Sequence, residues 1–292
     1  MIAVPVATMI GAFVTPIGST INLLALSNLE AFTGATITFV QWMAAGIPLA
    51  VVTLPVAWFI ILKVHKPADI NEAMVKAFID SLDIPKKITA PEVAVLIITG
   101  IMMALWVTSS WVRSINIMVV TLLGACVYCI PQLKTLRFDT FASSIGWDSV
   151  FLIATVLSLG ELMVSNGVSG WIVSILPAMD VPTPALVAFA ATLLFAMLVF
   201  IPVAPSLITI MSPPLISLAL GAGVSPEIMM LAAAICGCCC FLLPLDTVPL
   251  LTYGKGYYSI KDMFVSSLPI QVFIVAVMAL WLPVIGRVLG MA

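Results

Sequence analysis

Hydrophobic residues run along most of this chain in long stretches, and two of those stretches are interrupted in a similar way. The first stretch, 2–26, is broken at Pro16–Asn22, and a late stretch, 227–253, is broken at Pro244–Pro249. Unpaired backbone groups are costly in lipid, so a non-helical segment at membrane depth must be packed in protein or line a wet cavity. Two such breaks are typical of the binding site of a secondary transporter.

The other apolar stretches approach the roughly 20 residues that a membrane-spanning helix needs. They are 36–62, 92–111, 115–130, 148–164 and 264–289. We also expect a short surface helix at 70–82 and an interfacial helix at 169–176. The pattern therefore predicts an all-α, multi-pass integral protein of the cell membrane.

The segment 182–223 departs from this pattern. Its two apolar halves, 185–201 and 207–220, are short for membrane spans, and they flank Pro202–Ser206. Two prolines three residues apart remove backbone hydrogen bonds from a regular helix. A re-entrant hairpin with its tip inside the membrane is the natural interpretation, and two full spans joined by a turn in water are the alternative.

Composition supports the membrane assignment and excludes other classes. Hydrophobic residues make up 63% of the chain and charged residues 8%, against roughly 45–50% and about 25% in soluble domains. The net charge of −2, without a basic run, excludes a nucleic-acid partner. The cysteine cluster Cys236–Cys240 lies in an apolar stretch, where Cys packs as a small hydrophobic residue. Neither His-Glu-x-x-His nor Gly-x-Ser-x-Gly occurs, so the chain is not expected to be an enzyme.

The two breaks imply a duplicated structure whose first copy is incomplete. Several spans and the hairpin precede Pro244, whereas fifteen residues precede Pro16. We expect an incomplete first repeat at 1–63, a cytoplasmic polar loop at 64–91 and a second repeat at 92–292. The second repeat would contain the hairpin 182–223, a broken helix 226–253 and a last span 264–289. We interpret the chain as a truncated or split product, completed by a missing N-terminal half or by a second copy in a homodimer.

Three groups of residues resemble those of a known family, the divalent-anion:sodium symporters. Gly18-Ser19-Thr20-Ile21-Asn22 is similar to the family signature Gly-(Ser/Thr)-x-Pro-Asn, and the turn Gly223–Pro226 and the run Leu243–Pro249 also match. The resemblance extends over the whole chain, matched to the C-terminal two-thirds of the family. It implies two inverted repeats, each with a broken helix and a hairpin bearing Ser-Asn-Thr. It also implies sodium-coupled symport of dicarboxylates, tricarboxylates or sulfate.

The resemblance also suggests site residues. Gly18 would offer its backbone carbonyl to sodium, with Ser19 and Asn22 beside the substrate. We assign Asn22 to the cation site as well. The candidate substrate residues are those two and further polar residues of the breaks and the hairpin turn: Thr20, Ser206 and Thr247. The alternative is that Ser19, Thr20 and Asn22 hydrogen-bond the carbonyl groups that a kinked helix leaves free.

The chain departs from the family at three places. Val203–Pro205 stands where the second hairpin of the family carries Ser-Asn-Thr, and Leu250 stands where the family has Asn. Asp246 replaces a small residue. A carboxylate at mid-membrane costs about 2.5–3.5 kcal/mol on insertion scales, so it is a functional candidate. We expect Asp246 to bind the cation or, if desolvation raises its pKa, to carry a proton, and a protonated structural Asp is the alternative.

These features predict a secondary active transporter. A small anionic solute and sodium, or a proton, would bind together between the broken helices, with helix N-termini facing the anion and freed carbonyls facing the cation. No cofactor is expected besides the coupling Na⁺. The alternative is a non-transporting fragment or one subunit of a split transporter.

Overall fold

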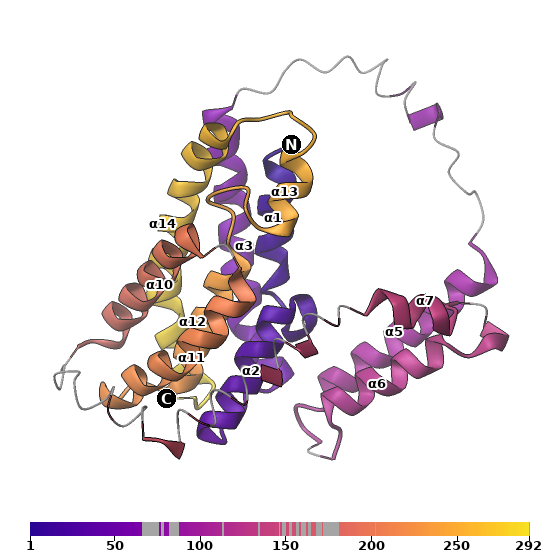
Figure 1. Ribbon diagram of the computed structural model, residues 1–292, viewed down its shortest axis with the longest axis horizontal. Coiled ribbons are helices and arrows are strands. Elements are labelled where there is room, and N and C mark those ends of the chain that lie inside the picture. Colours follow the sequence, from indigo (N-terminus) through magenta and orange to yellow (C-terminus); the bar gives the residue numbers. More distant parts are fainter. Residues whose placement is uncertain are drawn as a thin grey trace. The chain divides into compact units, whose positions relative to one another are not determined.

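In the computed structural model (Figure 1), the regular secondary structure of the described residues is entirely helical. The described residues are 1–65, 76, 79–81, 88–112, 114–133, 135–145, 147, 150–151, 154–155, 158, 162, 165–167, 171, 181–201 and 203–291. Within these ranges there is no strand. Five of the described helices are long and apolar enough to cross a membrane. The all-α membrane fold is therefore confirmed at this level.

The chain forms two compact units, residues 1–65 with 148–292 and residues 66–147. The larger unit contains both broken stretches. Its helices are α1 (Ala3–Ala12), α2 (Thr20–Thr33), α3 (Phe39–Val64), α10 (Thr183–Phe200), α11 (Ala204–Gly221), α12 (Pro226–Cys238), α13 (Thr247–Tyr253) and α14 (Ile260–Val288), with the 3₁₀ turn η1 (Pro16–Gly18) between α1 and α2.

Helix α12 is the centre of the larger unit (Figure 1). Every residue from Ile228 to Cys238 is buried, and the helix contacts α2, α10, α11 and α14. A helix that is apolar on all sides needs neighbours on all sides. This packing brings the C-terminal end of α12 next to the first break.

Local sequence signals explain where the long helices begin. Thr38 and Gln41 form a capping box at the start of α3, and Ser259 and Asp262 form another at the start of α14. Each box satisfies backbone N–H groups that the first turn leaves without partners. The indole of Trp281 on α14 donates to the carbonyl of Ala45 on α3 at 2.9 Å, which joins the two helices side by side.

Helices α10 and α11 occupy the segment predicted as a hairpin. Each has 18 residues, which is about 27 Å at 1.5 Å per residue. The second helix begins at Ala204, earlier than the predicted 207, because Pro205 lies in its first turn, where the missing N–H costs nothing. Helices of this length agree with two spans as well as with a hairpin, so the hairpin stays a prediction.

The smaller unit is a pair of apolar helices followed by short turns. It contains α5 (Ala90–Thr108), α6 (Ile117–Tyr128), the 3₁₀ turn η2 (Pro131–Leu133) and α7 (Phe138–Ser144). Trp106 on α5 donates to the Thr121 hydroxyl on α6 at 3.2 Å, and Gly124 leaves room for Met102. The predictions of helices at 70–82, 148–164 and 169–176 fall mostly outside the described residues.

Candidate functional site

The first break separates α1 from α2, and side chains satisfy its carbonyl groups. The amide nitrogen of Asn22 donates to the carbonyls of Ala12 and Thr15, at 2.9 and 2.8 Å. The indole of Trp42 on α3 donates to the carbonyl of Phe13 at 2.9 Å. Both side chains are buried, at 0% and 1% exposure. The break is therefore a fixed structure and not a frayed helix end.

The sequence predicted the first break at Pro16–Asn22, but α2 already begins at Thr20. Ser19 is the reason, since its hydroxyl oxygen accepts from the N–H of Ile21 at 3.2 Å and caps the helix. Asn22 consequently lies in the first turn of α2. Gly18 closes the break tightly, because a Cβ there would overlap the carbonyl of Ala12.

The second break separates α12 from α13, and α14 supports it. The side-chain amide of Gln271 on α14 is buried and donates to the carbonyl of Cys239 at 2.9 Å. The predicted bounds, Pro244–Pro249, are too late, because α13 resumes at Thr247 with Asp246 as its N-cap. Pro249 is tolerated in that first turn, as Pro205 is in α11, because the N–H that proline lacks would have no partner within the helix there.

The two breaks touch each other. The thiol of Cys238, the last residue of α12, donates to the side-chain oxygen of Asn22 at 3.1 Å. The amide of Asn22 thus makes three hydrogen bonds, all of them inside the protein. This is the structural role named above as the alternative for the polar residues of the first break. Direct binding of a ligand by Asn22 stays a prediction.

A cleft of about 370 Å³ opens between the breaks. Gly18 and Ser19 line it from the first break, and Cys238, Asp246 and Val248 line it from the second. The remaining lining residues are Thr8, Met9, Gly11, Ala12 and Ile21. Among these described lining residues, Asp246 is the one charged side chain.

The predicted site residues are only partly brought together. Gly18, Ser19 and Asp246 line the cleft, and Asn22 lies behind it. Thr20 and Ser206 are not among its lining residues. For Thr247 the structure describes the backbone, at the start of α13, and not the side chain.

Sequence reasoning missed the contribution of α1. Thr8, Gly11 and Ala12 line the cleft and are spaced as i, i+3 and i+4, so they share one face of the helix. That face is polar or small in an otherwise apolar segment, which was a usable signal. Cys238 was also missed, because a Cys within a cluster of cysteines suggests packing.

The arrangement can hold opposite charges close together. The N-terminus of α2 points its first N–H groups toward the break at Ser19, which favours an anion. The C-terminal end of α12 and the carboxylate of Asp246 favour a cation. A cation and an anion bound side by side in the cleft would compensate each other's charge.

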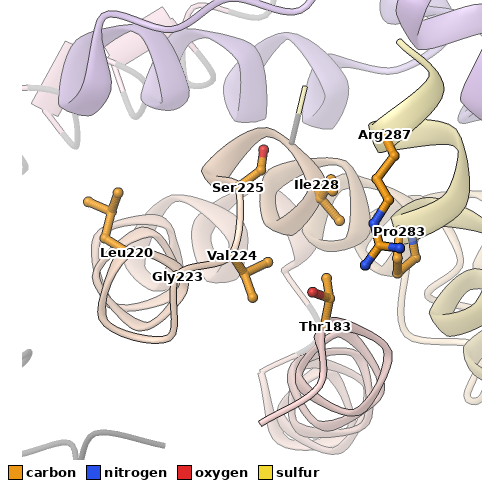
Figure 2. Close-up of a pocket in the computed structure, with 8 residues that line it drawn as sticks. All are labelled: Thr183, Leu220, Gly223, Val224, Ser225, Ile228, Pro283 and Arg287. Atoms are coloured by element: carbon orange, nitrogen blue, oxygen red, sulfur yellow. The ribbon is translucent and has the colours of Figure 1, made fainter. Parts of the chain in front are cut away.

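A second cavity, of about 390 Å³, lies at the other end of α12 (Figure 2). It contains Arg287 of α14, whose side chain extends past Pro283 toward Thr183 of α10, and the turn Gly223–Ser225. Because α12 has 13 residues, the two cavities are separated by about 18 Å of helix. The second cavity includes none of the predicted site residues.

Comparison with known proteins gives consistent matches. A family profile described as the sodium:sulfate symporter transmembrane region matches residues 1–292. The chain is 23% identical over 310 residues to the sodium-dependent dicarboxylate transporter SdcS of Staphylococcus saprophyticus, covering 98% of this chain and 59% of that protein. It is 23% identical over 282 residues to the protein of the same name in Staphylococcus aureus, covering 90% and 54%. The chain thus spans little more than half the length of these relatives.

Proposed function

Since this chain belongs to the sodium:sulfate symporter family, we propose that it carries the binding site of a secondary active transporter that couples a small anionic solute to sodium. The family consists of membrane transporters and not of enzymes, and five of the described helices are long and apolar enough to cross a membrane. The candidate solutes are dicarboxylates, tricarboxylates or sulfate, and two similar proteins are named as dicarboxylate transporters. A proton is the alternative coupling ion.

One observation carries the proposal: the two breaks, far apart in sequence, line a single cleft. Non-helical backbone at membrane depth is tolerated where it lines a wet cavity, and transporters use such segments to bind solute and ion together. In the proposed site the carbonyl of Gly18 and the carboxylate of Asp246 hold the cation. The hydroxyl of Ser19 and the positive end of the α2 helix dipole favour the anion.

An alternative is that the chain is one part of a larger transporter. The observation that favours it is the coverage of 59% and 54% of the two relatives. A missing N-terminal segment or a second copy of the chain would then supply the remaining wall of the site. Under this alternative the chain binds the ion but does not transport by itself.

Both the main proposal and the alternative require that the chain binds sodium, and a binding measurement tests this. The purified chain is unfolded by heat in sodium chloride and in choline chloride at equal ionic strength. We expect sodium to raise the unfolding midpoint, because an ion that binds only the folded state stabilises it, and we expect Asp246→Asn to reduce the effect. No difference between the two salts would contradict a sodium site.

Uptake into proteoliposomes then tests transport. Under the alternative just described, we expect the chain alone to insert in the membrane without saturable, sodium-driven uptake of succinate, citrate or sulfate, and co-expression with an upstream segment to restore it. Strong uptake by the chain alone would show that the part of the site described above suffices, with a homodimer as the simplest way to complete it.

A further inference from the structure

The second cavity, at the end of α12 away from the two breaks, has the chemistry of an anion site, and we propose that it binds the phosphate group of a membrane phospholipid. The proposal does not rest on the transport function, because this cavity shares no lining residue with the cleft between the breaks. A phospholipid headgroup and free inorganic phosphate carry the same group. The position of the cavity relative to the membrane favours the lipid.

Arg287 supplies the positive charge of the cavity. Its side chain extends past Pro283 toward Thr183 (Figure 2). Arg287 forms no ion pair with any residue in the described ranges. A guanidinium group carries five N–H donors in a planar fork that matches the oxygens of a phosphate. An anion in this cavity would therefore meet a charged donor that the described part of the protein does not already neutralise.

Helix α10 adds a hydroxyl group and a second source of positive potential. Thr183 is the first residue of this helix and lines the cavity. The first turn of α10 has no acidic residue, so its own sequence does not offset the positive end of the helix dipole. Arg287 and the start of α10 thus face the same space from two different helices.

Helix α12 contributes less, because it begins with an acidic residue of its own. Glu227 lies in its first turn, and the carboxylate of Glu227 accepts a hydrogen bond from the Ser225 hydroxyl. Ser225 lines the cavity, whereas Glu227 is not among the lining residues. We expect the negative charge of Glu227 to weaken the binding of a phosphate without preventing it.

The length of α14 places Arg287 at the level of lipid headgroups. The helix has 29 residues and ends at Val288, which gives about 43 Å at 1.5 Å per residue, and the hydrocarbon core of a bilayer is about 30 Å thick. Gln41, at the start of α3, donates to the carbonyl of Leu289 at 3.2 Å. The end of α14 is thus held beside the start of another span-length helix, where both leave the hydrocarbon.

An apolar surface leads from the cavity toward the middle of the membrane. Val272, Leu280 and Val284 of α14 are exposed and, with Arg287, lie on one face of the helix. Leu220, which lines the cavity, is exposed as well. Acyl chains would cover this surface while the phosphate binds Arg287. Free phosphate has no use for such a surface, and this is the reason to prefer the lipid.

Three soluble probes distinguish the two sources of phosphate. They are dihexanoyl phosphatidylglycerol, the matching dihexanoylglycerol without a phosphate, and inorganic phosphate. The purified chain in a non-ionic detergent is unfolded by heat at constant ionic strength, and the probe concentration that gives half-maximal stabilisation is measured. We expect the phospholipid to act at a concentration about tenfold lower than inorganic phosphate, and dihexanoylglycerol to have no effect in the same range.

Variants at the cavity assign the effect to Arg287. Arg287→Gln should raise the half-maximal concentration of the phospholipid by about tenfold or more, because hydrogen bonds to charged groups are the strong ones. Arg287→Lys, which keeps the charge but not the fork, should lose less. Lys261→Gln is the matched control, since it removes an exposed cation at the opposite end of α14. Stabilisation by sodium should survive in Arg287→Gln, which separates this proposal from the transport function.

Glu227→Gln gives a measurement that a damaged fold cannot imitate. Removing the negative charge beside the cavity should lower the half-maximal concentration by a factor of about two or more, a gain of affinity.

The proposal is overturned if dihexanoylglycerol stabilises as well as the phospholipid, or if Arg287→Gln and Lys261→Gln change the affinity equally. Inorganic phosphate that binds as well as the phospholipid would overturn the lipid as the ligand.

Discussion

The two breaks are built differently although they line the same cleft. In the first break, Asn22 and Trp42 satisfy three carbonyls between Ala12 and Thr15. In the second, α14 satisfies the carbonyl of Cys239 through Gln271, and Asp246 brings a charge. The first break is thus a preformed cradle of backbone groups, and the second is a charged segment supported from a neighbouring helix. The difference suggests that the first break holds backbone groups in fixed positions around the cleft, and that the second break contributes the charged side chain.

The contact between Cys238 and Asn22 connects the two breaks. A single amide holds the first break together and also accepts from the end of α12. The end of α12 is therefore hydrogen-bonded to the residue that shapes the first break.

The largest effect is expected for Asn22→Leu. Leu has a similar size but cannot donate or accept, so the buried carbonyls of Ala12 and Thr15 lose their partners. An unsatisfied buried polar group costs about 1–3 kcal/mol, and we expect a total loss of about 2–5 kcal/mol. Thermal unfolding of the purified protein measures it. Thr20→Val, two residues earlier and on an exposed side chain, should cost far less, and an equal cost for both variants would remove the special role of Asn22.

A smaller effect is expected for Gly18→Ala. The new Cβ would overlap the backbone carbonyl of Ala12, so the backbone of the first break would have to move to make room for it. We expect a loss of about 1–3 kcal/mol together with weaker stabilisation by sodium. Gly11→Ala is the matched control, because it also lies at the cleft but a Cβ there meets nothing within 4 Å. If sodium binding weakened only in Gly11→Ala, the proposed role of the backbone around Gly18 in holding sodium would be contradicted.

The smallest effect is expected for Gln271→Met, which removes one hydrogen bond from the second break with little change in volume. Loss of the bond to the carbonyl of Cys239 should cost about 1–2 kcal/mol, less than the loss for Asn22→Leu. The same unfolding experiment compares the two. If Gln271→Met proves the more damaging, the second break is the more constrained one and the comparison must be reversed.

The existence of both breaks could be predicted from sequence, since proline and small polar residues interrupt apolar stretches there. Their bounds could not, because they depend on the cap formed by Ser19 and on the tolerance of Pro249 in a first turn. In both places the helix resumes earlier than the prolines and polar residues suggested.

The composition of the site was harder to predict. Asn22 was assigned to ligand binding because it belongs to a signature, but its oxygen bonds Cys238, 216 residues away along the chain. No local pattern reports such a contact. Thr20 and Ser206 were chosen for polarity alone, and polarity does not state which side of a helix faces a cleft. Asp246 was predicted to bind the cation because a charge in an apolar stretch is informative by itself. The residue lines the cleft, and cation binding stays a prediction.

The central claim is that the two breaks line one cleft, and cross-linking tests it most directly. Ser19→Cys and Asp246→Cys are combined in a chain whose native cysteines are replaced, with Cys238 as Ser. A short bifunctional thiol reagent is added, and the joined peptides are measured by mass spectrometry. Asn28→Cys with Ser212→Cys is the positive control, since those side chains are hydrogen-bonded at 3.0 Å. Ser19→Cys with Ser225→Cys, at the other end of α12, is the negative control. We predict efficient linkage of positions 19 and 246 and none of 19 and 225. Failure to link 19 and 246 while the positive control reacts would contradict the account.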